Sequence, residues 1–241
     1  MRRVLITGAG RGLGLEFVRQ CLDRGDKVLA GVRHPEKARA LQELKTTQGE
    51  QLTLVTLDVA DTASIEASWQ TVRSSYDALD LLINNAGINS MSHDAGGAAA
   101  HSRLGELDPE QINAMFRVNA IDPLMMAQRY LDLLKAGNSP RVVSISSWLG
   151  SLTDKTKGGN YSYCASKTAL NMLMRTLAFD VIKEGIVAVV VNPGWVQTDM
   201  GGSKASLTPK ESVQGLLQVV DNLTEKDAGR FFNRDGTEHP W

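Results

Sequence analysis

Six short runs of β-branched and other apolar residues recur along this chain of 241 residues, and longer stretches with helical periodicity separate them. We predict strands at residues 3–7, 27–32, 51–57, 79–83, 141–146 and 186–192. Residues 187–191 (VAVVV) are apolar at every position, as expected of a parallel strand that helices cover on both faces. The alternation predicts one doubly wound α/β domain over residues 1–241, with a mostly parallel sheet of about seven strands.

Signals at helix starts and near position 231 support this organisation. Asp61 precedes one periodic stretch, and Asp108 stands before Pro109 at the start of another. Thr208-Pro209-Lys210-Glu211 has the pattern of a capping box. The apolar pair at 231–232 is a candidate for the seventh strand. The segment from there to residue 241 is a candidate to pack over the site or over a neighbouring subunit.

A glycine-rich segment, Thr7-Gly8-Ala9-Gly10-Arg11-Gly12-Leu13-Gly14, follows the first predicted strand and opens a helix. Glycines permit a tight turn and a close approach of the backbone to a pyrophosphate, and a helix N-terminus attracts negative charge. Gly8, Gly12 and Gly14 give the spacing G-x-x-x-G-x-G rather than G-x-G-x-x-G. Directly after the first strand, the segment predicts a dinucleotide site in a Rossmann fold; the alternative is a glycine-rich turn without a ligand.

The end of the second predicted strand bears on the choice of cofactor. It reads Ala30-Gly31-Val32-Arg33 and offers no acidic residue. Free ribose hydroxyls usually meet Asp or Glu here, whereas a 2′-phosphate meets Arg. Arg33, with Arg11 as a second cation, therefore favours NADP(H) over NAD(H), unless Arg33 is only a solvated surface residue.

Tyr163 and Lys167 stand four residues apart at the start of a long predicted helix, so they share one face of it. A nearby ammonium group favours the phenolate, and we therefore expect Lys167 to lower the pKa of Tyr163. Alone, the spacing Tyr-x-x-x-Lys is a weak signal, and it gains meaning only beside a cofactor site and a substrate anchor.

Seven short motifs follow one another along the chain. They are residues 7–14, Asp58-Val59, Asn84-Asn85-Ala86-Gly87, Asn119, Ser146-Ser147, Tyr163 with Lys167, and Asn192-Pro193-Gly194 with Thr198. In this order and spacing they resemble the short-chain dehydrogenase/reductase family over essentially the full chain. Residues 194–202, 207–209, 229–231 and 240–241 are most similar to the sniffer-like and C-factor-like carbonyl reductases of that family.

The resemblance implies four catalytic roles. Tyr163 would be the general acid in reduction and the base in oxidation, and Lys167 would lower its pKa and hold the nicotinamide ribose. Ser147 would hydrogen-bond the substrate carbonyl, and Asn119 would hold a water that links Lys167 to solvent. Developing oxyanion charge needs such donors. Tyr161 is a rival for Tyr163, and Ser146 is a rival for Ser147.

The resemblance also implies contacts to the cofactor and the substrate. The implied cofactor-binding residues are Gly8, Arg11, Gly12, Leu13, Gly14, Arg33, Asp58, Val59, Asn85, Ala86, Gly87, Tyr163, Lys167, Pro193, Gly194, Val196 and Thr198. Asp58 has an alternative role as a cap at a strand end. Besides Ser147 and Tyr163, Trp148 and Trp195 are candidates for the wall of a substrate pocket, and residues 89–104 and 199–207 are candidate substrate loops.

Composition narrows the range of partners. The chain has 26 basic and 27 acidic residues without long runs of either, which does not favour nucleic acid. No apolar run reaches the ~18 residues that would span a bilayer. The four histidines are scattered, and we interpret them as surface residues that form no metal site. The chain has only two cysteines, so a cytoplasmic location is the default. By analogy with the family we expect a homodimer or a homotetramer that acts on a small-molecule carbonyl or alcohol.

The leading hypothesis from the sequence is an NADPH-dependent oxidoreductase that reduces a ketone, aldehyde or quinone to an alcohol, with Tyr163 as proton donor. One alternative is an NAD(P)-dependent alcohol dehydrogenase that works in the oxidative direction with the same residues. Another is a C-factor-like NAD(P)-binding signalling protein.

Overall fold

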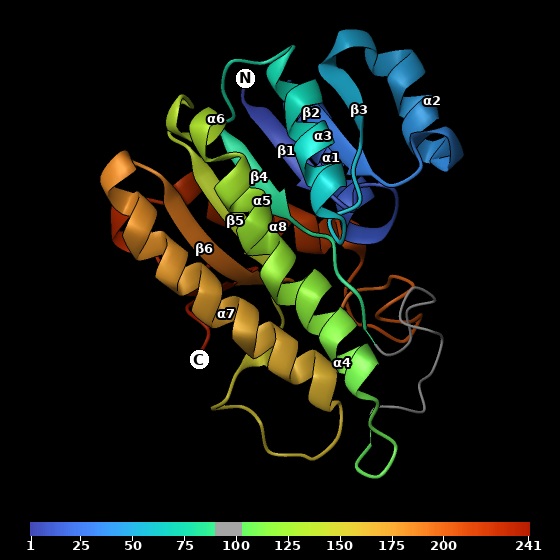
Figure 1. Ribbon diagram of the computed structural model, residues 1–241, viewed down its shortest axis with the longest axis vertical. Helices are drawn as coiled ribbons and strands as arrows, with labels where there is room; N and C mark the ends of the chain where they lie inside the picture. The colour runs from blue at the N-terminus through green and yellow to red at the C-terminus, as the bar shows by residue number, and fades with distance from the viewer. Residues whose placement is uncertain (90–102) are drawn as a thin grey trace.

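The computed structural model describes residues 1–89 and 103–241. Seven strands form one sheet in the order β3-β2-β1-β4-β5-β6-β7, and all neighbouring strands are parallel (Figure 1). The strands are β1 (Arg3–Thr7), β2 (Lys27–Val32), β3 (Leu52–Thr56), β4 (Leu81–Asn84), β5 (Arg141–Ile145), β6 (Val187–Asn192) and β7 (Phe231–Asn233). The doubly wound fold and the expected seventh strand are confirmed, and β1 and β2 have the predicted bounds.

Helices cover both faces of this sheet. They are α1 (Gly12–Asp23), α2 (Arg39–Gln48), α3 (Thr62–Arg73), α4 (Pro109–Phe116), α5 (Asp122–Arg129), α6 (Leu131–Lys135), α7 (Tyr161–Val181) and α8 (Pro209–Asn222). Successive strand residues enter opposite cores: Val4 and Ile6 pack with α1, α2 and α8, whereas Leu5 packs with α3, α5 and α6. Figure 1 shows α5 and α7 side by side over one face. Burial on both faces explains the continuous apolar runs of the sequence.

The predicted helix caps are present. The Asp61 side chain accepts from the amide of Ala63, and Asp108 accepts from that of Glu110, each at 2.9 Å. Thr208 and Glu211 form the reciprocal capping box, with bonds of 3.2 and 2.9 Å. These bonds satisfy amide groups that a helix start leaves unpaired, and they fix where α3, α4 and α8 begin.

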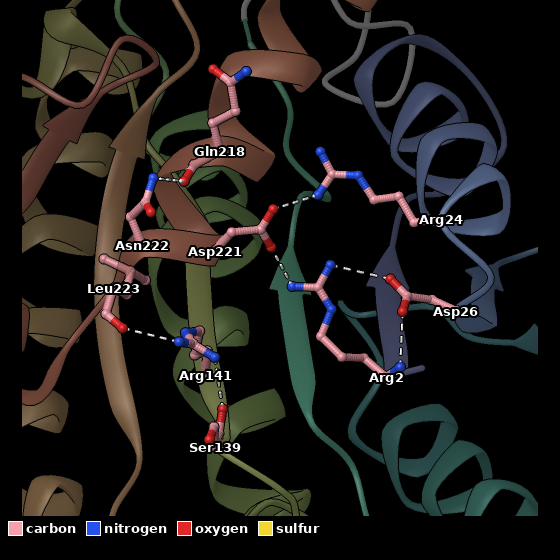
Figure 2. A network of polar contacts seen from close by, with 9 residues as sticks. All are labelled: Arg2, Arg24, Asp26, Ser139, Arg141, Gln218, Asp221, Asn222 and Leu223. Atoms are coloured by element: carbon pink, nitrogen blue, oxygen red, sulfur yellow. Dashed lines mark hydrogen bonds and ion pairs between the residues drawn. The ribbon is translucent and has the colours of Figure 1, made fainter.

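An ionic network joins separate elements at the amino ends of the strands (Figure 2). Asp221 of α8 accepts from the guanidinium groups of Arg2 and Arg24, both at 2.8 Å. The buried Asp26 accepts from the backbone amide of Arg2 at 2.8 Å and from its guanidinium at 3.2 Å. The start of β1, the α1–β2 turn and the end of α8 are thereby held together, on the edge of the sheet away from the glycine-rich loop.

The expectation that all four histidines lie on the surface is wrong for His239. Its side chain is buried, its ring lies edge-on to Phe231 with centroids 4.7 Å apart, and its amide donates to the Phe231 carbonyl at 2.7 Å. The cause is that residues after β7 turn back along this strand, with a bridge between Phe232 and Glu238. His34 is exposed as expected, and His93 and His101 lie outside the described residues.

Two glycines of the same loop are predicted to respond differently to alanine. A Cβ on Gly14 would lie 2.2 Å from the carbonyl oxygen of Gly8, whereas one on Gly10 would make an ordinary contact of 3.4 Å with Val32. We expect Gly14→Ala to lower the free energy of unfolding by about 2 kcal/mol or more, although alanine normally stabilises a helix. Gly10→Ala should be nearly neutral. Urea denaturation of both variants checks this, and equal midpoints would contradict it.

Candidate active site

The predicted catalytic residues converge at the carboxyl edge of the sheet. Ser147 follows β5, Tyr163 and Lys167 lie in the first turns of α7, and Asn119 lies in a π-helical turn, Arg117–Ile121, between α4 and α5. A Cβ on Gly87, just after β4, would be 3.2 Å from Oδ1 of Asn119 and 3.7 Å from Nζ of Lys167. Four elements distant in sequence therefore meet around one point.

Lys167 is the buried cation of this site. Its side chain is only 5% exposed, and Nζ donates to the carbonyl oxygen of Ile145 at the end of β5, at 2.8 Å. Burial lowers the pKa of the ammonium from 10.5 to about 8. Gly150 packs directly on the lysine, since a Cβ there would stand 2.9 Å from Cβ of Lys167. The lysine is thus held by the end of a strand and by the turn after Ser147.

The expected lowering of the Tyr163 pKa by Lys167 is wrong for this structure. Burial of the phenol raises its pKa from 10.0 to about 12, and a hydrogen bond with Ser147 opposes the rise. Nζ of Lys167 lies 5.9 Å from the centre of the tyrosine ring and donates to Ile145 instead. Desolvation therefore sets the direction of the pKa shift, and Tyr163 is a protonated phenol at neutral pH.

The geometry separates the rival serines and tyrosines. Ser146 is buried and donates to Oδ1 of Asn171 at 2.6 Å, so its hydroxyl serves the interior. Ser147 accepts from the amide of Leu149 at 3.2 Å and interacts with the Tyr163 phenol. Tyr161 is exposed at the first position of α7. Ser147 and Tyr163, the residues that the sequence favoured, are the ones that face each other.

The side chain of Asn119 forms its hydrogen bonds within the protein. Its Oδ1 accepts from the amide of Ile88 and its Nδ2 donates to the Ile88 carbonyl, both at 2.8 Å. Nδ2 also donates to Oγ of Ser166 at 3.0 Å, and the residue is fully buried. The amide thus fixes the segment after β4 against α7. A water at Asn119 would bind the backbone, where a π-helical turn departs from the regular hydrogen-bond series.

Asn171 belongs to the site and was missed from the sequence. Its Nδ2 donates to the carbonyl of Gly150 at 3.2 Å, and its Oδ1 accepts from Ser146, so it holds the turn after β5 on α7. The available signal was spacing: Asn171 lies four residues after Lys167, on the face that also carries Tyr163, and it is a polar residue there.

The glycine-rich loop is shaped for the approach of a ligand. Gly8 and Gly12 adopt φ of 65° and 54°, in the left-handed region that favours glycine. The Thr7 hydroxyl accepts from the amides of Asn85 and Ala86, both at 3.0 Å, and thereby ties the end of β1 to that of β4. Because the side chain of the N-cap residue Arg11 makes no capping bond, the first amides of α1 suit an anion such as a pyrophosphate.

Asn85 and Asp58, two expected cofactor contacts, also bond within the protein. Nδ2 of Asn85 donates to the carbonyls of Thr7 at 2.9 Å and Gly8 at 3.2 Å, so it stabilises the loop. Oδ1 of Asp58 accepts from the amide of Ala60 at 3.0 Å. One carboxylate oxygen of Asp58 therefore caps the backbone after β3, which is the alternative role that the sequence left open.

The segment after β6 lies against the glycine-rich loop. Arg11 and Asp199, both exposed, form an ion pair of 3.2 Å, and a Cβ on Gly12 would lie 3.3 Å from the side chain of Thr198. Oδ1 of Asn192 accepts from the amides of Trp148 and Gly194, at 3.2 and 3.1 Å. The turns after β5 and β6 are thus joined on the same side of the sheet as the catalytic residues.

Large apolar side chains are exposed in the segments that follow β5 and β6. Trp148 is 45% exposed, Leu152 is 73% exposed and Trp195 is 52% exposed, and Nε1 of Trp195 donates to the Gly201 carbonyl at 2.8 Å. Such side chains suit an apolar substrate. The candidate loop at residues 89–104 falls almost entirely outside the described residues.

A dinucleotide loop beside a tyrosine, a lysine and a serine defines an oxidoreductase of the Rossmann type. A family model described as short chain dehydrogenase matches residues 2–208. The chain belongs to the short-chain dehydrogenase family.

Individual relatives agree with this assignment. The C-signal of Myxococcus xanthus is 42% identical over 163 residues, which are 68% of this chain and 93% of that protein. The NADPH-bound carbonyl reductase from chicken fatty liver is 36% identical with a TM-score of 0.90, covering 100% of this chain and 99% of that one. The carbonyl reductase Sniffer of D. melanogaster is 31% identical with a TM-score of 0.91 and full coverage of both chains.

The part of the chain that the structure describes holds neither a membrane-spanning helix nor a metal-binding cluster. None of its helices is long and apolar enough to cross a membrane. No three histidine, cysteine, aspartate or glutamate side chains there are grouped so that they could hold a metal ion.

The low pKa of Lys167 predicts how stability depends on pH. The unfolded lysine binds its proton up to pH 10.5 and the folded one only up to about pH 8, so the free energy of unfolding should rise between these values, by at most about 3 kcal/mol. In Lys167→Met this contribution should vanish. Urea denaturation at pH 7 to 10.5, with the variant's curve subtracted from the wild type's, isolates the lysine. A flat difference would contradict the prediction.

Proposed function

We propose that this protein is an NADPH-dependent carbonyl reductase that converts a ketone, aldehyde or quinone to an alcohol. The observation that carries the proposal is the contact of Ser147 with a protonated Tyr163, beside a buried Lys167 and the glycine-rich loop. The similarity to carbonyl reductases, including one solved with NADPH, supports it.

The side chains suit the proton transfer of such a reduction. The nicotinamide, when bound, supplies the hydride to the carbonyl carbon. The Ser147 hydroxyl donates a hydrogen bond to the carbonyl oxygen and orients it. Tyr163 then gives its proton to that oxygen, so the carbonyl gains one hydride and one proton and becomes an alcohol.

Lys167 serves this step by its charge. As the phenol loses its proton, the neighbouring ammonium stabilises the phenolate, an effect that is largest where water is excluded. In the same site Lys167 would hold the nicotinamide ribose. A proton returns to Tyr163 from solvent by way of Lys167 and water at the backbone of Asn119.

The cofactor preference rests on cations at the adenosine end. Arg33 is exposed directly after β2, and Arg11 is exposed at the start of α1. Both suit the 2′-phosphate of NADP(H), and relatives solved with NADP(H) support this choice. In this proposal the other expected residues also contact the cofactor. They include Leu13, Val59, Ala86, Pro193 and Val196.

The surface of α7 is compatible with a homodimer or homotetramer. Met172 is 65% exposed and Phe179 is 61% exposed on this helix, and α4 packs beside it. Large exposed apolar side chains on a helix face are typical of subunit contacts.

We place the enzyme in the cytoplasm, where NADPH is available to it.

Two other functions remain as competing proposals. The same residues would catalyse alcohol oxidation, with Tyr163 as base, if the cofactor were supplied oxidised. The 42% identity to a C-signal protein favours a binding or signalling role as the other candidate. NADPH binding without turnover of any carbonyl in a broad panel would support that role.

We expect Tyr163→Phe to lower kcat for carbonyl reduction by about 10²–10⁴-fold, because the proton donor is lost. NADPH affinity should stay within about twofold, since only stabilisation of the transition state is removed. NADPH oxidation against a carbonyl panel and calorimetric titration with NADPH measure the two quantities. Tyr161→Phe is the matched control and should keep the wild-type rate. A Tyr163→Phe enzyme that retains its rate would remove the tyrosine from its proposed role.

We expect Arg33→Ala to raise KM for NADPH by roughly tenfold or more while leaving KM for NADH nearly unchanged, because only NADPH carries the 2′-phosphate. Arg39→Ala, which removes an exposed arginine from the nearby α2, should change neither constant. Steady-state kinetics with both cofactors give the comparison. Equal effects of Arg33→Ala on NADPH and NADH would refute a phosphate contact.

A further inference from the structure

Residues 238–241, which we call the strap, lie against the loop of residues 151–160 that connects Ser147 to Tyr163. The carbonyl oxygen of Trp241 accepts two hydrogen bonds from Thr153, at 2.9 Å from its amide and 2.7 Å from its hydroxyl. Nε2 of His239 lies 3.4 Å from a carboxylate oxygen of Asp154. The strap therefore binds Thr153 by two hydrogen bonds and lies beside Asp154.

The strap is itself anchored on the core. The rings of Phe231 and Trp241 are 5.5 Å apart, and the guanidinium of Arg175 lies 4.8 Å from the centre of the Trp241 ring. Phe231 is fully buried among residues of α7, including Leu170 and Met174. The strap thus rests on β7 and on the same helix that carries Tyr163 and Lys167.

The loop has few other attachments. Asp154 and Lys155 bond within the loop, and Nζ of Lys155 lies 3.4 Å from Sγ of Cys164 at the start of α7. Over residues 152–159, the hydrogen bonds and ion pairs that leave both the loop and α7 all go to the strap, as far as residues 1–89 and 103–241 are concerned. The turn before the loop is held separately, by Gly150 on Asn171 and Thr168.

We propose that the strap is a positioning element of the reaction site, with Trp241 as its main residue. By binding Thr153 it sets the path of the chain between Ser147 and Tyr163 and the place of the neighbouring exposed Leu152. The strap would thereby determine how a carbonyl substrate is oriented, and not how the cofactor is held, because the glycine-rich loop lies on other strands. The inference rests on the proposed carbonyl reduction.

The test compares Trp241→Ala with Trp241→Phe and with the matched control Trp69→Ala. Trp69 also stacks on arginines, at 3.3 Å from Arg129 and 5.1 Å from Arg73, but on α3. We expect Trp241→Ala to lower kcat/KM for a carbonyl by roughly tenfold, since small misplacements of reacting groups are costly. NADPH affinity, measured by calorimetry, should change less than twofold. Trp241→Phe should restore most of the activity, and Trp69→Ala should keep the wild-type kcat/KM.

Hydrogen–deuterium exchange of residues 151–160 supplies a readout that does not need turnover. Faster exchange of this loop in Trp241→Ala, and not in Trp69→Ala, is expected. Unchanged exchange, or an unchanged kcat/KM for the carbonyl in Trp241→Ala, would overturn the proposal. A wild-type protein that binds NADPH and reduces no carbonyl would instead refute the proposed function, and the exchange result would then decide whether the strap positions the loop.

Discussion

The ammonium group of Lys167 lies beneath the carboxyl edge of the sheet, where water does not compensate for its charge. Its bond to the Ile145 carbonyl makes the end of β5 part of the site. The surrounding chain packs closely on this side chain, since a Cβ on Gly150 would stand 2.9 Å from Cβ of Lys167. Tyr163, one turn earlier on α7, takes its place from the same helix. The end of β5, the turn at Gly150 and the start of α7 therefore meet at one buried lysine.

The two ends of the parallel strands carry different kinds of polar contact. At the amino ends, Arg2, Asp26 and Asp221 form ion pairs that connect β1 to α8, and partly exposed pairs of this kind each contribute little. At the carboxyl ends, the side chains of Thr7 and Asn119 hold loops in place by hydrogen bonds to backbone amides. The second arrangement is the more constrained, because buried polar groups without partners are costly. Variation of substrate among related enzymes can then arise in the outer loops while this inner frame stays the same.

How much the sequence predicted depended on whether a signal was local. Strands 3–7 and 27–32 were found at their observed bounds because burial on both faces leaves an unbroken apolar run. The glycine-rich loop and the helix caps are also local patterns. The raised pKa of Tyr163 was not predicted, because it follows from burial in the folded chain. The bonds of Asn119 to Ile88 and the burial of His239 were not predicted, because each depends on residues that only the fold brings together. Asn171 escaped notice for the same reason, since its partners Ser146 and Gly150 become visible only in the folded chain.

The position of β1 inside the sheet, between β2 and β4, has a consequence for synthesis on the ribosome. Thr7 emerges among the first residues, yet its partners Asn85 and Ala86 follow only when β4 has been made. Because chains fold from the N-terminus as they are made, the dinucleotide loop can close before α7 has left the exit tunnel. The strap comes later still, after β7. A growing chain can therefore form the turn of its glycine-rich loop early, whereas the segment after β6 that lies against this loop joins only after α7 has been made.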